Sequence, residues 1–259
     1  MKILLLKFRN IGDVLLSTPL VNNLRHHYPN AQIDFCVNKE TEAMLTLNPN
    51  LNKIITYDRI AIKSLTSIKR LWRELQFIRS FKKENYDVVI NLTSGDRGNL
   101  IAWISNATTR IGYSNKSWFF RKSLTHELPK QELRHTVDAS LDPLRLLNIP
   151  ISNKSVEIFW NSKDEQAISS ELTNINNFIH LHPVSRWLFK CISDNIMAQI
   201  IDYCQLNIGL KVVITASEDK FELEKVNKIL SLTKSKPINL SGKLSLKETA
   251  ALNKKAKLF

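Results

Sequence analysis

Residues 2–19 read KILLLKFRNIGDVLLSTP, and the rest of the chain is organised around this stretch. A short apolar run at 3–6 is followed by a tight polar loop at 7–12, and an amphipathic segment opens at Asp13. Apolar runs this short, bounded by turn signals, suit a strand that is buried on both faces of a parallel sheet. The loop then lies at the carboxyl end of the strand, where open α/β sheets bind ligands. We expect Gly12 to permit a backbone shape that a side chain would hinder.

Asp13 has two interpretations. It can be the N-cap of the helix that follows, which is a common position for Asp and contributes roughly 1 kcal/mol. It can also be a general base, with its carboxylate facing a cleft and taking a proton from an acceptor hydroxyl. The residues alone leave both interpretations open.

Strand and helix signals alternate along the whole chain, which predicts parallel βαβ units and an α/β fold. The pattern restarts after Pro150, and this indicates two domains that face each other, 1–150 and 151–259. The predicted strands are 3–6, 32–37, 53–57, 87–92, 110–113, 156–160, 178–182, 211–215 and 237–240. The predicted helices include one opening at Asp13 and kinked at Pro19, and 41–47, 64–83, 99–105, 136–147, 164–172, 193–205, 220–232 and 245–255.

The predicted helix at 64–83 combines an apolar stripe with a dense basic stretch. Its apolar residues have the spacing of a core-facing stripe, and in 193–205 the same holds for Ile196, Ile200, Ile201 and Cys204. The formal net charge of +13 favours anionic partners such as nucleic acid, acidic lipid or a phosphorylated sugar, although a solvated helix face explains many basic runs. The stripe of 64–83 consists of Leu65, Ile68, Trp72, Leu75 and Ile78, and the basic stretch of Lys69, Arg70, Arg73, Arg79, Lys82 and Lys83, against Glu74 alone.

Composition excludes several classes of protein. The 259 residues are 43% hydrophobic, yet no apolar run approaches the roughly 20 residues of a membrane span. The first apolar run ends at Lys7, which is too early for a signal peptide. The three cysteines are widely spaced, which argues for a reducing compartment and against a disulfide framework or a zinc site. The sequence therefore predicts a cytoplasmic protein.

A second candidate site is the stretch HPVSRWLFK at 182–190, which connects a predicted strand to a helix. Free N–H groups at a helix N-terminus favour anions. Ser185 can donate a hydroxyl hydrogen bond, and Arg186 and Lys190 can place positive charge on a phosphate. His180 and His182 would face the same way, but a third ligand of matching spacing does not appear, so we reject a metal site. A G-x-G-x-x-G fingerprint and a Walker loop are also absent from the sequence, which disfavours nicotinamide and P-loop chemistry.

With both sites in view, the sequence resembles the ADP-heptose:lipopolysaccharide heptosyltransferases of glycosyltransferase family 9. The matching segments run along essentially the whole chain in the order of the family. The DRG loop and the S-R-W-x-F-K pattern are most similar to the heptosyltransferase III subgroup, which adds the third, branching heptose of the inner core. The segments are KILLLKFRNIGDVLLSTP, NLTSGDRG, RHTVDASL, HPVSRWLFK and LSGKLSLKETAAL.

The resemblance implies a GT-B fold, in which 1–150 binds the acceptor and 151–259 binds the nucleotide sugar. It implies an inverting, metal-independent transfer of L-glycero-D-manno-heptose from ADP-heptose to the inner core of lipopolysaccharide, with no cofactor besides the donor substrate. Carried over by motif, Asp13 corresponds to the general base, and Lys190 steadies the donor diphosphate with Ser185 and Arg186 beside it. Direct displacement needs a carboxylate for the attacking hydroxyl and positive charge for the departing ADP.

Three further residues are candidates for substrate binding, and each also has a structural interpretation. Arg97 and His135 are placed near the phosphorylated acceptor, or they form structural hydrogen bonds. Glu218 holds the ADP ribose, or it begins the helix that follows, where a carboxylate is favoured.

The expected partners are ADP-heptose, the lipid A–core glycolipid and, peripherally, the inner face of the inner membrane; nucleic acid is not favoured, and we expect a monomer. One feature departs from the family. Its pattern continues past Leu258 and Phe259 into a buried strand and the motif G-x-D-(S/T)-x-x-x-H, so we expect an incomplete, C-terminally truncated second domain. The alternative function is therefore a catalytically inactive remnant that binds only the anionic glycolipid acceptor.

Overall fold

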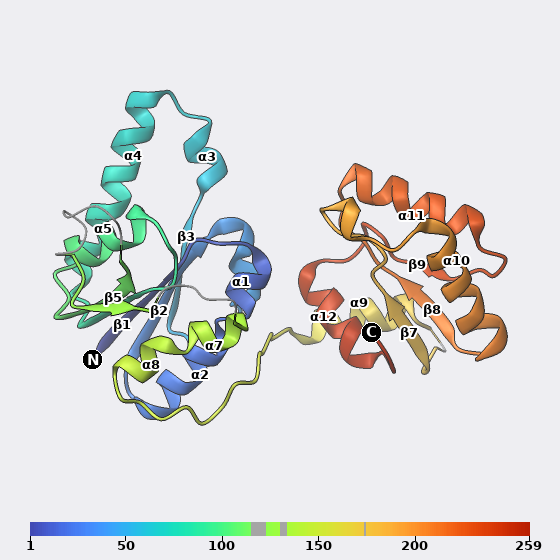
Figure 1. Ribbon diagram of the computed structural model, residues 1–259, viewed down its shortest axis with the longest axis horizontal. Helices are drawn as coiled ribbons and strands as arrows, with labels where there is room; N and C mark the ends of the chain where they lie inside the picture. Colours follow the sequence, from blue (N-terminus) through green and yellow to red (C-terminus); the bar gives the residue numbers. More distant parts are fainter. Residues whose placement is uncertain (115–122, 130–133, 174) are drawn as a thin grey trace. The chain divides into compact units, whose positions relative to one another are not determined.

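The structure is a computed structural model that describes residues 1–114, 123–129, 134–173 and 175–259. The chain separates into two compact units, Met1–Phe159 (unit 1) and Trp160–Phe259 (unit 2) (Figure 1). Each unit is a parallel sheet with helices packed on its faces.

Unit 1 is built on a six-stranded sheet with the order β3-β2-β1-β4-β5-β6, and each neighbouring pair is parallel. The first strand is central because its side chains are apolar on both faces: Ile3 and Leu5 join one core cluster, and Leu4 and Leu6 join the other. The strands are β1 (Lys2–Lys7), β2 (Gln32–Asn38), β3 (Lys53–Tyr57), β4 (Val88–Asn91), β5 (Thr109–Tyr113) and β6 (His126–Leu128).

The helices of unit 1 cover both faces of this sheet. Two helices that the sequence predicts as continuous are divided. Pro19 and Pro143 each lie in the first turn of a new helix, where the missing N–H of proline has no intrahelical partner to lose. The helices are α1 (Ile11–Leu15), α2 (Thr18–His27), α3 (Arg59–Lys63), α4 (Ser67–Ser80), α5 (Asp96–Ile104), α7 (Thr136–Ser140) and α8 (Asp142–Leu146), with the 3₁₀ turns η1 (Lys39–Met44) and η2 (Phe81–Glu84).

Unit 2 has a three-stranded parallel sheet of β7 (Phe178–Leu181), β8 (Lys211–Ile214) and β9 (Ile238–Asn239), in that order. On the other side of β7, Ile179 pairs with Leu258 in a parallel bridge, as expected for the first residues of a further strand. The helical segments are α9 (Ser162–Glu171), the 3₁₀ turn η3 (Leu188–Lys190), α10 (Asp194–Asp202), the π-helical turn η4 (Tyr203–Asn207), α11 (Lys220–Leu232) and α12 (Leu246–Lys255).

The strand predicted at 156–160 does not form. The backbone of this segment is bound by side chains of α2 instead of by a neighbouring strand. The Glu157 N–H donates to Thr18 Oγ1 at 3.1 Å, and the Ser152 N–H donates to Asn23 Oδ1 at 2.8 Å. The Glu157 amide, and before the segment the Ser152 amide, are thus satisfied without a neighbouring strand.

The prediction that the apolar stripe of 64–83 faces the core is confirmed for Ile78 and wrong for Ile68, Trp72 and Leu75. Of α4, only Ile78 is buried, whereas Ile68 is 83% exposed and Trp72 is 66% exposed. The stripe is genuine, but α4 extends past the sheet (Figure 1), so no described element of unit 1 covers its outer residues. Ile196, predicted to point inward on α10, is also exposed.

Within the described ranges, no helix combines the length and the apolar character that crossing a bilayer requires.

Candidate functional site

A cavity of about 300 Å³ opens beside Asp13, at the carboxyl end of β1. The sheet places it there because β1 and β4 are parallel neighbours, so the loops that follow them meet at one edge. Those loops are bound together: the Phe8 N–H donates to Thr93 Oγ1 at 2.9 Å, and Arg9 donates to Ser94 Oγ at 3.0 Å. The lining residues are Lys7, Arg9, Asp13, Leu92, Tyr113, Arg134, Thr136, Ala139 and Ser140.

Asp13 is half-buried in this cavity and is not the N-cap. Asn10 is the N-cap of α1, and Asp13 is the third helical residue, whose Oδ2 accepts the Asn10 N–H at 3.3 Å. This reciprocal capping box uses one carboxylate oxygen only. Gly12 also departs from expectation: it lies inside α1 with an ordinary helical backbone, and a Cβ there would have no neighbour within 4 Å. Its conformation therefore does not require glycine.

Three cationic side chains, Lys7, Arg9 and Arg134, line the cavity with Asp13, and none of them was predicted from the sequence as a site residue. Lys7 is buried, and its Nζ donates to the Leu92 carbonyl at 3.1 Å. Burial lowers the pKa of Lys7, while the Asp13 carboxylate opposes that shift. Arg134 reaches the cavity from the start of α7. The family motifs could have identified these cations, because Lys7 and Arg9 lie in the first motif, KILLLKFRNIGDVLLSTP, and Arg134 begins RHTVDASL.

Arg97 is held elsewhere. Its guanidinium forms an ion pair with Glu74 at 2.8 Å, donates to the Tyr57 hydroxyl at 3.0 Å and lies 4.1 Å from the centre of the Tyr57 ring. Burial, together with the hydrogen bond to Glu74, raises the pKa of Tyr57 to about 12. Arg97 is not among the residues that line the Asp13 cavity. Its observed contacts are structural ones that join α5 to β3 and α4.

His135 is the N-cap of α7. Its Nδ1 accepts the Val137 N–H at 3.3 Å, so one ring nitrogen is used by the helix. The side chain is exposed, and its sequence neighbours Arg134 and Thr136 line the Asp13 cavity. His135 is therefore next in sequence to two lining residues but is not itself among the residues that line the cavity.

In unit 2, the predicted donor residues lie in the segments that follow β7 and β8 in sequence: Ser185, Arg186 and Lys190 after β7, and Glu218 after β8. Ser185 Oγ accepts the Trp187 N–H at 3.4 Å. Arg186 and Lys190 are exposed and make no ion pair with any acidic residue that the structure describes. Glu218 is exposed in the loop after β8, and Asp219, not Glu218, caps α11.

His180 and His182 share one hydroxyl. The Oγ1 atom of Thr215 lies 2.8 Å from His180 Nε2 and 3.0 Å from His182 Nδ1. Because a hydroxyl has a single proton, it donates to one ring and accepts from the other. Burial lowers the pKa of His180 to about 4, so this ring is neutral at physiological pH.

Comparison with known proteins gives a consistent result. A sequence model of the family described as Glycosyltransferase family 9 (heptosyltransferase) matches residues 74–259. Lipopolysaccharide heptosyltransferase 3 of Escherichia coli is 29% identical over 255 residues, which cover 96% of this chain and 74% of that protein.

Solved structures have the same fold. The glycosyltransferase family 9 protein of Veillonella parvula superposes with a TM-score of 0.86 at 24% identity, covering 99% of this chain and 74% of that one. The E. coli heptosyltransferase WaaC, solved with ADP-2-deoxy-2-fluoro heptose, gives a TM-score of 0.75 at 15% identity, with coverages of 100% and 82%. The predicted α/β fold of the GT-B class is thereby confirmed.

Proposed function

Because the chain belongs to glycosyltransferase family 9, the heptosyltransferases, we propose that it transfers L-glycero-D-manno-heptose from ADP-heptose to the inner core of lipopolysaccharide. The WaaC structure holds a fluorinated ADP-heptose, and the E. coli relative is named for lipopolysaccharide, which supports this donor and this acceptor class. The similarity to heptosyltransferase 3 favours the third, branching heptose as the product.

The observation that carries the proposal is the half-buried Asp13 carboxylate in a cavity with Lys7, Arg9 and Arg134. A carboxylate with one oxygen free of the capping box can accept the proton of an attacking hydroxyl. The cations favour an anionic acceptor such as a phosphorylated core sugar. Asp13 acts in the reaction as general base, and direct attack by the activated hydroxyl inverts the anomeric carbon.

The donor is held by residues of unit 2. Lys190 and Arg186, whose charges are unpaired among the described residues, neutralise the diphosphate as ADP departs, and Ser185 donates a hydroxyl hydrogen bond to it. Glu218 accepts hydrogen bonds from the ribose hydroxyls. Since these groups supply positive charge directly, the transfer proceeds without a metal ion.

Because the acceptor is a glycolipid, the enzyme works peripherally at the cytoplasmic face of the inner membrane. We propose that it does so as a monomer. His135 contacts the acceptor at the border of the cavity. Arg97 has an indirect role on the acceptor side: its hydrogen bonds to Glu74 and Tyr57 hold the start of α5, and with it the loop after β4, in place. Unit 1 binds the acceptor and unit 2 binds the donor.

The test is transfer from radiolabelled ADP-heptose to a heptose-deficient core acceptor. Asp13→Asn is expected to lower turnover by about 10²–10⁴-fold, the usual contribution of a general base. Asp164→Asn is the matched control, because Asp164 is also the third residue of a helix and accepts the N–H of its Asn161 cap at 2.9 Å. Equal turnover in both variants would remove Asp13 from the reaction.

Calorimetric titration with ADP and with the acceptor glycolipid distinguishes an active transferase from a catalytically inactive remnant. A glycosyltransferase binds ADP, and Lys190→Ala weakens that binding. A remnant binds the acceptor glycolipid alone, and that result would contradict the proposed transfer.

A further inference from the structure

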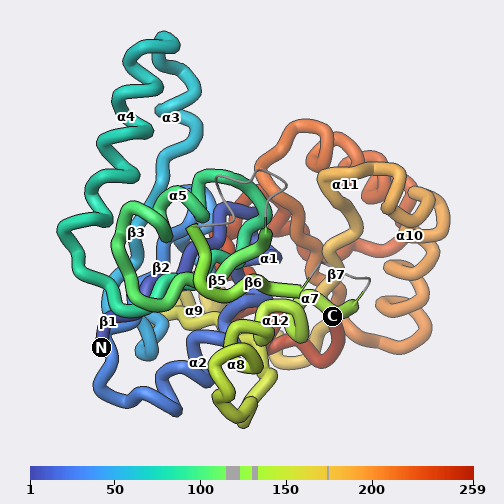
Figure 2. The backbone as a smooth tube through the Cα atoms, turned by 60° about the vertical axis from the view of Figure 1, so that its left-hand side comes forward, coloured from blue at the N-terminus to red at the C-terminus, as the bar shows by residue number. Residues whose placement is uncertain are grey.

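Helices α3 and α4 form an arm that extends past the sheet of unit 1. We define the α3–α4 arm as residues 59–83; Figures 1 and 2 show its two helices side by side, beyond the other helices of this unit. The arm is joined to the unit at its base, where Ile78 and Phe81 are buried and Arg97 pairs with Glu74. It is therefore a fixed element of unit 1, and its outer part is exposed among the residues of this unit that the structure describes.

The outer face of the arm is apolar. Ile68, Leu71, Trp72 and Leu75 are 83%, 62%, 66% and 38% exposed. Their spacing of i, i+3, i+4 and i+7 places them on one face of α4. A hollow of about 570 Å³ runs along this face, bordered by Trp72, Leu75, Arg79 and Lys83. A contiguous exposed apolar face of this kind marks an interaction surface.

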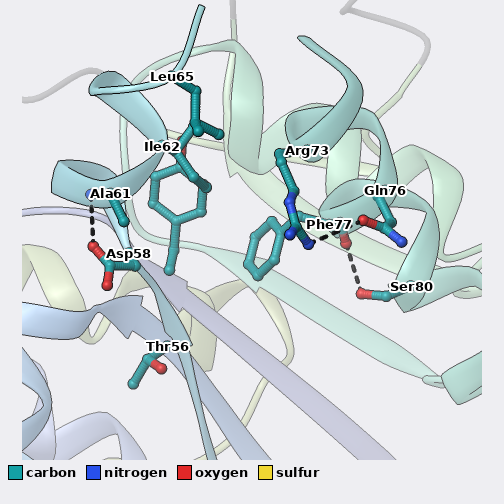
Figure 3. Close-up of a pocket in the computed structure, with 10 residues that line it drawn as sticks. Thr56, Asp58, Ala61, Ile62, Leu65, Arg73, Gln76, Phe77 and Ser80 are labelled. Carbon is teal, nitrogen blue, oxygen red and sulfur yellow. Dashed lines mark hydrogen bonds between the residues drawn. The ribbon is translucent and has the colours of Figure 1, made fainter. Parts of the chain in front are cut away.

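A second hollow, of about 520 Å³, separates the two helices of the arm. Figure 3 shows Ile62 and Leu65 of the α3 side facing Phe77 and Arg73 of α4. Apolar side chains therefore line the arm on its inner side as well, and a basic side chain lies at the rim.

The charge of the arm is strongly one-sided. Residues 59–83 contain eight Lys and Arg and a single acid, Glu74, which is neutralised by its ion pair with Arg97. Seven of the basic residues form no ion pair with an acidic residue that the structure describes: Lys63, Lys69, Arg70, Arg73, Arg79, Lys82 and Lys83. Positive charge beside exposed Trp, Leu and Ile is the pattern of a helix that lies in a membrane interface.

We propose that the α3–α4 arm docks on the surface of an anionic phospholipid bilayer, with Ile68, Leu71, Trp72 and Leu75 inserted at the headgroup level. The basic residues then contact lipid phosphates, which supply the opposite charge. A second copy of the chain is a poor occupant of this face, because it would present the same surplus of positive charge. The proposal deepens the proposed function, since it names the part of the chain that meets the membrane. It rests on the proposed function for the biological role of docking, whereas the binding itself is tested without it.

The test is co-sedimentation of the whole chain with vesicles that contain no glycolipid acceptor. Binding is expected to mixed phosphatidylcholine–phosphatidylglycerol vesicles and to be much weaker with phosphatidylcholine alone. The triple variant Ile68→Ser, Leu71→Ser, Trp72→Ser is expected to lose about tenfold or more in partitioning. The triple variant Lys69→Gln, Arg70→Gln, Lys83→Gln is expected to lose about a hundredfold.

The matched control is Tyr203→Ser, Leu206→Ser, Ile208→Ser, because these side chains of unit 2 are 59%, 63% and 51% exposed. This control is expected to bind vesicles as the unchanged chain does. Equal binding by the control and by the Ile68, Leu71, Trp72 variant would overturn the proposal, as would arm-dependent self-association without vesicle binding. Binding only when the vesicles contain the glycolipid acceptor would also overturn it, and would assign the arm to acceptor recognition.

A transfer assay separates this proposal from the proposed function. With a deacylated, water-soluble acceptor, the Ile68, Leu71, Trp72 variant is expected to keep the turnover of the unchanged chain. Absence of transfer by both, with arm-dependent vesicle binding intact, would contradict the transferase and leave the docking surface standing.

Discussion

The side chain of Asn91 occupies the space that a Cβ on Gly98 would need. A Cβ built on Gly98 would lie 2.2 Å from Asn91 Oδ1, far inside van der Waals contact. Asn91 ends β4, and it donates to Asn99 Oδ1 at 2.8 Å while its own Oδ1 accepts the Thr93 N–H at 3.0 Å. Gly98, in the first turn of α5, thus leaves room for the buried Asn91 side chain, which fixes the turn that follows β4.

We therefore expect Gly98→Ala to displace Asn91 and to lower the free energy of unfolding by about 2–4 kcal/mol, since a buried polar pair is lost and a clash is added. Gly12→Ala is the control, because a Cβ at that helical position meets nothing and alanine favours a helix by about 0.5–1 kcal/mol. Urea unfolding measures both variants. Equal stability of the two would show that Asn91 rearranges at no cost.

The stability of unit 2 is expected to fall in acid because of His180. Its pKa is lowered by burial from 6.5 to about 4, so between these pH values the unfolded chain binds a proton that the folded chain does not. The contribution of the neutral ring is complete above pH 6.5 and is lost as the pH falls toward 4, by at most about 3 kcal/mol. Hydrogen exchange of the β7 amides against pH measures this slope.

Two histidine variants test whether His180 causes this pH dependence of stability. His180→Gln is expected to flatten it, because the titrating ring is removed. His26→Gln, at an exposed histidine of α2, is expected to keep the slope of the unchanged chain. A slope that persists in His180→Gln would assign it to other groups.

Arg97 is expected to stabilise the base of the α3–α4 arm. Arg97→Met removes the ion pair with Glu74 and the stacking on Tyr57, and we expect a loss of about 1–3 kcal/mol in the free energy of unfolding. Glu74→Gln is expected to cost less, and the double variant to cost less than the sum, because the two residues share one interaction. Strict additivity in urea unfolding would contradict the observed pairing.

The buried parts of the fold are predictable from the sequence because their patterns are local. The run that becomes β1 is apolar from Ile3 to Leu6, and β3 has the bounds that the sequence predicts, 53–57. The interpretation of Trp72 failed for a different reason. Helical spacing shows that a stripe exists, but only the tertiary structure shows whether anything covers it.

The candidate site was predictable only in part. Asp13 follows a strand and precedes a helix, which is a local pattern, and the structure places it in a cavity. Arg134 reaches the same cavity from more than a hundred residues away in sequence, and no local pattern pairs the two. The strand predicted at 156–160 failed because Asn23 and Thr18 of α2 bind the backbone of that stretch and its approach.

Arg134 and Arg145 offer a matched pair that separates structure from function. Both form ion pairs with the buried Asp142, but Arg134 alone of the two lines the cavity of Asp13. Arg134→Gln and Arg145→Gln are each expected to lower the free energy of unfolding by about 1–2 kcal/mol, because Asp142 keeps one partner in either case.

Their effects on transfer should differ. We expect Arg134→Gln to lower kcat/KM by about ten- to a hundredfold, since one charged hydrogen bond to an anionic acceptor is worth roughly 1.5–3 kcal/mol. Arg145→Gln is expected to leave kcat/KM close to that of the unchanged chain. Equal losses in the two variants would mean that Arg134 acts only by holding Asp142, and the acceptor phosphate would then have to be bound by Lys7 and Arg9 alone among the cations that line the cavity.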